Sequence, residues 1–284
     1  MSVVQRDPAL HEHLVRLADR ARMVCVAGLP GTGKSLVIHQ LAHLAVADGR
    51  TVHLLQWDVA RPAFEASPAG QRYPVVDGVT QPMIRKAVGL WARRAVAAWH
   101  QCCPTPDHLL VVELPLVGRR LIELAQRLGD DAEPLLAARS CRFAIVVPSV
   151  EVRRHVEAER ERRASAPGNA REREDAPPHV LRDLWRQLLV AARALRLTSA
   201  LDTAPYEPVV YRRVYETVLR ERAPEILPLD TILPTATMSV YDFAVPCTDL
   251  TPGEDDIDAS IRASERRFPD PVALARDVER WWVV

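Results

Sequence analysis

The sequence predicts an α/β protein built on a doubly wound, five-stranded parallel sheet with helices on both faces. Three observations support this prediction. Short, uninterrupted apolar runs alternate along the chain with longer helical patterns, as expected of strands that crossover helices bury on both faces. Hydrophobic residues make up 48% of the 284 residues, which is enough for a large core. No apolar run approaches the roughly 18–20 residues that a membrane-spanning helix needs.

The first half of the chain supplies three of the expected strands. We expect these strands at 23–27, 51–56 and 109–113, and helices at about 8–20, 34–47 and 83–101. Segment 60–80 is rich in Pro, Gly and Asp and therefore predicts a loop, whereas 121–128 predicts a helix.

The second half of the chain supplies the other two strands, expected at 143–147 and 225–233. Pro228 cannot donate a ladder hydrogen bond, so the last strand should lie at an edge of the sheet. Helices are expected at 150–164, 179–197 and 206–222, and the polar segment 165–178 predicts a loop.

The expected organisation is one domain over residues 1–245, with a lid at about 150–180, and a C-terminal extension over 246–284. The extension begins acidic and turn-rich and closes with a helix that ends in Trp281 and Trp282. Leaving two indole rings in water is unfavourable, so we expect this helix to pack on the domain or on a second copy in a homodimer.

Charge and cysteine content exclude several classes of protein. The 37 basic residues balance 37 acidic ones, so no long-range field favours nucleic acid or an anionic membrane. The five cysteines form no C-x-x-C pair, and the nine histidines show no metal-binding spacing. The polar N-terminus does not look like a signal peptide, so we expect a soluble, cytoplasmic protein with reduced thiols.

The segment 28–35 reads Gly-Leu-Pro-Gly-Thr-Gly-Lys-Ser, a complete G-x₄-G-K-[ST] pattern between a predicted strand and a predicted helix. Glycines let successive N–H groups point at one anion, and the helix start adds partial positive charge. Lys34 is expected to reach the β- and γ-phosphates, and the Ser35 hydroxyl to ligate Mg²⁺. The residues expected to hold ATP here are Gly28, Pro30, Gly31, Thr32, Gly33, Lys34 and Ser35.

The chain lacks the sequence signatures of several other nucleotide-binding classes. A GTPase reads guanine with Asn-Lys-x-Asp, and the single asparagine, Asn169, is followed by alanine. No strand ends in Asp-Glu, as in AAA+ enzymes and helicases, and no Ser-Gly-Gly signature of transport ATPases is present.

Acidic and basic side chains follow two of the expected strands. Asp58 and Arg61 follow the second strand, where they are expected to orient or deprotonate an acceptor hydroxyl and to hold an anionic substrate. Glu113 ends the third strand and is expected to hold water on Mg²⁺. The alternatives are a turn residue for Asp58, a surface salt bridge for Arg61 and no ligand role for Glu113.

The helix after the fourth strand is dense in arginine. Arg153, Arg160 and Arg163 share one face and are expected to stabilise a migrating phosphoryl group, with Arg163 also binding the nucleotide. The alternative is a solvated helix held by i,i+4 pairs such as Arg153–Glu157.

With these residues, the chain resembles the nucleoside and nucleotide kinase-like branch of P-loop NTPases over about residues 20–235. The resemblance rests on GLPGTGKS, Asp58-x-x-Arg61, the LVVE strand end and FAIVVPS before the arginine-rich helix. It implies an ATP-Mg-dependent kinase that phosphorylates a nucleoside-, nucleotide- or vitamin-like acceptor. Two alternatives stay open: a regulatory or chaperone-like ATPase that switches a partner protein, and a domain that binds ATP without turnover.

Overall fold

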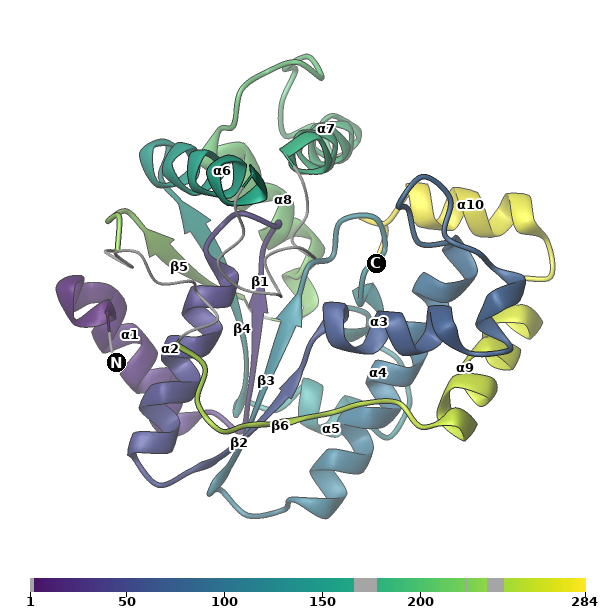
Figure 1. The fold of residues 1–284 in the computed structure, drawn as a ribbon, viewed down its shortest axis with the longest axis horizontal. Helices are drawn as coiled ribbons and strands as arrows, with labels where there is room; N and C mark the ends of the chain where they lie inside the picture. The colour runs from purple at the N-terminus through teal and green to yellow at the C-terminus, as the bar shows by residue number, and fades with distance from the viewer. Residues whose placement is uncertain (1–2, 166–177, 223, 234–242) are drawn as a thin grey trace.

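The fold is an open, six-stranded, all-parallel sheet with helices on both faces (Figure 1). The computed structural model describes residues 3–165, 178–222, 224–233 and 243–284. The strand order is β5-β4-β1-β3-β2-β6. This confirms the predicted α/β class and parallel sheet, but the predicted number of five strands is wrong by one.

The strands lie close to the predicted runs. They are β1 (Met23–Ala27), β2 (Thr51–Leu55), β3 (His108–Leu114), β4 (Cys141–Pro148), β5 (Glu225–Leu229) and β6 (Thr248–Asp249). As Pro228 predicted, β5 is an edge strand that pairs with β4 alone. The additional strand is β6, which pairs with the other edge of the sheet through β2.

The helices connect and cover these strands. They are α1 (Pro8–Arg20), α2 (Lys34–Ala47), α3 (Trp57–Ala66), α4 (Pro82–Cys102), α5 (Glu133–Leu136), α6 (Val150–Ser165), α7 (Pro178–Ala194), α8 (Pro208–Val218), α9 (Glu254–Arg267) and α10 (Pro271–Glu279). Single 3₁₀ turns are η1 (Val4–Arg6), η2 (Gly70–Arg72), η3 (Ile122–Leu124) and η5 (Arg220–Arg222). No helix among the described residues is both long and apolar enough to cross a bilayer.

The central strand β1 shows why the sheet needs helices on both sides. All five of its residues are buried, and they alternate between two apolar cores. Val24 and Val26 pack with α1 and α2, whereas Cys25 and Ala27 pack with α3, α4 and α8. Because side chains alternate between the faces of a strand, an uninterrupted apolar run fills both cores.

Two predictions of local structure are wrong. Segment 60–80 begins with the end of α3 rather than a loop, because Trp57, Ala60 and Phe64 share one buried helix face despite Pro62 within the helix. The predicted helix at 121–128 is only the turn η3, since Leu121 has a left-handed backbone (φ 60°) that breaks a helix there. The apolar residues of that segment fill the core from a loop.

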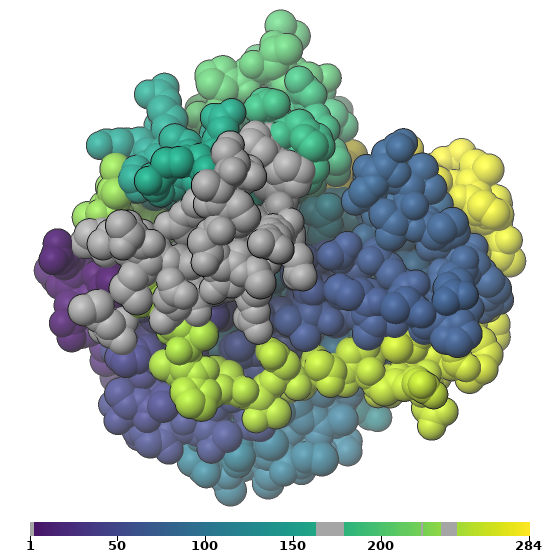
Figure 2. All heavy atoms as spheres, in the orientation of Figure 1, coloured from purple at the N-terminus to yellow at the C-terminus, as the bar shows by residue number. Residues whose placement is uncertain are grey.

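The C-terminal extension packs on the same body as the rest of the chain. β6 joins the sheet beside β2, and α9 packs along α4. The segment carrying β6 runs over the face in view toward the C-terminal helices at the edge (Figure 2). Trp281 is 1% exposed in the larger core. The C-terminal helices therefore pack on the domain itself, which is one of the two arrangements predicted for this extension.

Candidate nucleotide-binding site

The loop between β1 and α2 has a backbone that requires glycine. Gly31 and Gly33 have φ values of 74° and 88°, in the left-handed region that L side chains avoid. A Cβ at Gly33 would also lie 2.6 Å from Leu229 Cδ2. At Gly28, a Cβ would lie 2.7 Å from the hydroxyl of Tyr211. The glycines of the sequence pattern are therefore needed for both conformation and space.

Neighbouring side chains hold this loop from several sides. The Thr32 hydroxyl donates to the Leu29 carbonyl at 2.7 Å, and the Leu29 amide donates to the Tyr211 hydroxyl at 3.2 Å. Arg153 on α6 donates to the Pro30 carbonyl at 3.1 Å. Tyr211 is a supporting residue that the sequence did not single out for this loop, because its own helix comes long after the loop in the chain. The loop is thus fixed before any ligand binds.

The start of α2 leaves backbone donors without an internal partner. The first N–H groups of a helix have no carbonyl one turn earlier, and the N-cap residue Gly33 supplies no side-chain hydrogen bond. Ser35 lies in this first turn and is half-buried. Such a helix start favours a negatively charged ligand.

Lys34 lies beneath the loop and pairs with Glu113. Its ammonium is 3.3 Å from Glu113 Oε1 and donates to the Leu29 carbonyl at 3.2 Å, with 4% of the side chain exposed. The sheet makes this pair, because Glu113 on β3 is in register with Val26 on the adjacent β1. Burial lowers the pKa of Lys34 and raises that of Glu113, while the partner's charge opposes the shift in each case.

Asp58 and Arg61 follow β2, as predicted, and both lie on α3. Asp58 is exposed in the first turn, and its negative charge acts to raise the pKa of both Lys34 and Glu113. Arg61 pairs with Glu65 one turn further along α3, at 3.3 Å. The expected salt bridge of Arg61 is therefore present, but it is half-buried rather than on the surface. Of the two residues, Asp58 is the one whose charge acts on Lys34.

Arg120 is a site residue that the sequence did not single out. Burial lowers the pKa of its guanidinium, and the nearby charge of Asp58 opposes this shift while that of Arg61 adds to it. Its position depends on the loop after β3, where Leu116, Arg119 and Leu121 have φ values of 62°, 66° and 60°. Non-glycine residues in this conformation are strained and occur often at functional sites.

Arg153 and Arg160 bring α6 over the loop. Arg153 is 2% exposed, contacts the loop as described, donates to Glu157 Oε1 at 2.6 Å and stacks over the Tyr206 ring at 5.5 Å. The expected i,i+4 pair Arg153–Glu157 is therefore present, although Arg153 itself is buried rather than solvated. The charge of Arg160 acts to lower the pKa of Lys34 and of Glu113. The side chain of Arg163, and most of the predicted loop at 165–178, lie outside the described residues.

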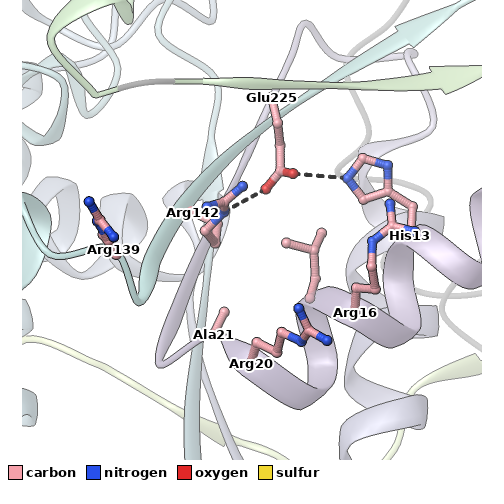
Figure 3. A pocket seen from close by; sticks show the side chains of 8 residues that line it. His13, Arg16, Arg20, Ala21, Arg139, Arg142 and Glu225 are labelled. Carbon is pink, nitrogen blue, oxygen red and sulfur yellow. Dashed lines mark hydrogen bonds and ion pairs between the residues drawn. The ribbon is translucent and has the colours of Figure 1, made fainter.

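A separate hollow of about 230 Å³ lies between α1 and the strands β4 and β5 (Figure 3). Glu225 points into it and accepts hydrogen bonds from His13 at 3.1 Å and from Arg142 at 2.9 Å. Arg16 and Arg20, also in its wall, have acidic partners on α1. The hollow contains no residue predicted to bind nucleotide.

Comparisons with protein-family models, with curated proteins and with solved structures found no match.

Proposed function

We propose that the protein is an ATP-Mg-dependent small-molecule kinase with a P-loop kinase-like fold. One observation carries the proposal: Lys34 is held by Glu113 beneath a glycine loop whose helix start has no side-chain cap. Backbone donors, a helix dipole and a buried ammonium thus converge where a polyphosphate would bind. Five free cysteines and ATP as donor fit a cytoplasmic enzyme.

The residues present fit ATP and Mg²⁺ chemically. Glycine lets the loop take its tight path, because a Cβ at Gly28 or Gly33 would collide with other protein atoms. Ser35 offers a hydroxyl and Glu113 a carboxylate, both hard oxygen donors of the kind that Mg²⁺ prefers. Bound Mg²⁺ would neutralise charge on the β- and γ-phosphates. Lys34 would then turn from Glu113 to phosphate oxygens, so the ion pair keeps the lysine in place beforehand.

The acceptor side of the proposed site contains Asp58, Arg61 and Arg120. Asp58 is exposed and is therefore accessible to an acceptor hydroxyl, which it would orient or deprotonate. Arg120 would bind an anionic part of the acceptor, with Arg61 beside it. On the opposite side, α6 would act as the lid, with Arg153 and Arg160 stabilising the transferred phosphoryl group. The proposed acceptor is a nucleoside-, nucleotide- or vitamin-like molecule.

The test is ADP formation measured with and without a panel of nucleosides, nucleotides, vitamins and sugars, with mass spectrometry of the products. Lys34→Met should abolish ATP binding or turnover. Asp58→Asn should lower kcat about 100-fold or more while ATP binding is retained. Asp48→Asn, at the exposed end of α2, is the matched control and should behave as wild type. If ADP formation never depends on an acceptor and no product gains phosphate, the kinase proposal fails.

A second candidate is a regulatory ATPase that switches a partner protein. It is favoured by an ion pair between Asp277 on α10 and Arg119, 3.1 Å apart, because Arg119 directly precedes Arg120 of the site. The C-terminal helix thus contacts the loop that positions a site residue. Acceptor-independent ATP hydrolysis would favour this candidate, and ATP binding without hydrolysis would favour a non-catalytic domain.

A further inference from the structure

Two histidines and a cysteine meet at the amino-terminal end of the sheet, away from the proposed nucleotide site. His53 Nε2 lies 3.1 Å from His108 Nδ1 and 4.0 Å from Cys103 Sγ. Each residue presents one donor atom, and these atoms all lie within 4.8 Å of one another. All three side chains are half-buried. Three such donors at these distances could share one metal ion.

Separate elements bring these donors together, which explains why no sequence spacing predicted them. His53 is on β2, His108 opens the adjacent strand β3, and Cys103 caps the C-terminus of α4. The parallel register places Thr51 opposite His108, two residues from His53 along β2. The donors therefore meet only once the sheet and α4 have formed.

Neighbouring groups hold two of the donors in place. The Trp99 ring packs edge-on against His53, with centroids 5.8 Å apart. Arg22 lies over the same indole at 5.1 Å and donates a hydrogen bond to the Cys103 carbonyl. In known metal sites, contacts of this kind from residues around the ligands orient the ligands and raise the affinity for the metal.

The donor atoms and their spacing fit a borderline-soft transition metal. In a tetrahedral zinc site, bond lengths of about 2.05 Å to nitrogen and 2.3 Å to sulfur separate two nitrogens by about 3.3 Å and nitrogen from sulfur by about 3.6 Å. The observed distances of 3.1 Å and 4.0 Å differ from these by a few tenths of an ångström. Imidazole and thiolate suit zinc, copper or nickel, whereas Mg²⁺ and Ca²⁺ need oxygen ligands.

We propose that His53, Cys103 and His108 form a zinc-binding site with three protein ligands and an open fourth position. The site is distinct from the proposed nucleotide site. Glu113 lies five residues beyond His108 along β3, about 16 Å away at the rise of a strand. A bound ion would tie the end of α4 to β2 and β3, so metal binding should also stabilise the fold.

The test titrates the tag-free, nucleotide-free, metal-depleted protein with Zn²⁺ in a calorimeter and with Co²⁺ in a spectrophotometer. We expect one equivalent of either ion, a thiolate-to-cobalt charge-transfer band and a zinc-dependent rise in Tm. Cys103→Ser should abolish the band. Cys103→Ser and His53→Gln should each weaken zinc binding by more than the roughly 10–100-fold that loss of a second-shell partner causes.

Cys102→Ser is the matched control, because Cys102 is the neighbouring thiol and is exposed. This variant should bind zinc and cobalt as the wild type does. Circular dichroism of each metal-free variant checks that it has folded. The proposal is overturned if the wild type binds no ion, if cobalt shows no thiolate band, or if Cys103→Ser and His53→Gln both keep wild-type affinity.

Discussion

Replacing Lys86 by methionine should destabilise the fold, because Lys86 is the positive centre of a buried charge cluster. Its side chain is fully buried, with the ammonium 2.8 Å from Glu123 Oε1 and 3.3 Å from Asp277 Oδ2. Arg119 lies 3.1 Å from Asp277 and 3.7 Å from Glu123. Two positive and two negative groups therefore balance in a space from which water is largely excluded.

The magnitude follows from the charge that Lys86→Met leaves behind. Methionine keeps most of the apolar stem but removes one positive charge, so the cluster gains a net negative charge. Breaking a buried ion pair costs about 3–5 kcal/mol. Arg119 still contacts both carboxylates, and Asp277 is 27% exposed, so we expect the lower end of this range. A loss of about 3 kcal/mol corresponds to a fall in Tm of roughly 6–12 °C for a domain of this size.

Urea unfolding monitored by circular dichroism measures this loss directly. Lys86→Met/Asp277→Asn restores the balance of charge and should recover at least about 1 kcal/mol relative to the single variant. Lys34→Met, at the only other lysine, should cost less stability, because Glu113 has a raised pKa and takes up a proton more readily once its partner is gone. The reasoning is refuted if Lys86→Met unfolds at the wild-type urea concentration, or if the double variant is less stable than the single one.

Two further predictions concern the glycine loop and the arginine-lined hollow. Gly33→Ala should lose stability and ATP affinity, because it adds the left-handed strain of about 1–2 kcal/mol and a Cβ 2.6 Å from Leu229 Cδ2. Gly49→Ala, with φ 81° and no atom within 4 Å of the added Cβ, should lose only the stability that the backbone strain costs. An equal loss of stability for the two variants in thermal unfolding would contradict this. Burial raises the pKa of Glu225, but hydrogen bonds from His13 and Arg142 outweigh burial and lower the pKa from 4.5 to about 2. A lowered carboxylate pKa stabilises the fold above the unfolded pKa, so the stability difference between wild type and Glu225→Gln in urea titrations should be full above pH 4.5 and vanish toward pH 2. A constant difference across that range would contradict the assignment.

The parts of the fold that the sequence predicted are those that local chemistry determines. The central strands have uninterrupted apolar runs because both of their faces are buried, and the glycine loop has a fixed residue pattern because its backbone needs glycine. The pairing of Lys34 with Glu113 could also have been predicted, since Lys34 follows β1 and Glu113 lies near the end of β3, at the same edge of the sheet. β6 was not, because its two residues, Thr248 and Asp249, become a strand only by pairing with β2.

The missed site residues depend on tertiary structure in the same way. Arg120 lies near Asp58 and Glu113 because of the conformation of the loop that carries it. The left-handed positions of this loop are leucine and arginine, residue types from which a left-handed backbone is not predicted. His53, Cys103 and His108 depend on strand register and on where α4 ends. In each case the residues meet because of how separate elements are arranged in space, and this arrangement cannot be predicted from composition or from spacing along the chain.

The two lysines show how side-chain shape decides between residues of equal charge. Of 37 basic residues only Lys34 and Lys86 are lysines, and both are buried against a glutamate. An ammonium is a compact point charge, whereas the planar guanidinium of arginine needs room for five donors. Little space is left around Lys86, since a Cβ at Gly89 would lie 1.8 Å from Oε2 of Glu123, the ion-pair partner of Lys86. At Lys34, a Cβ at Gly28 would lie 3.3 Å from the lysine Cδ. Buried arginines of this chain, such as Arg93, have several acceptors around the guanidinium, whereas Lys34 and Lys86 each place one compact charge against a glutamate.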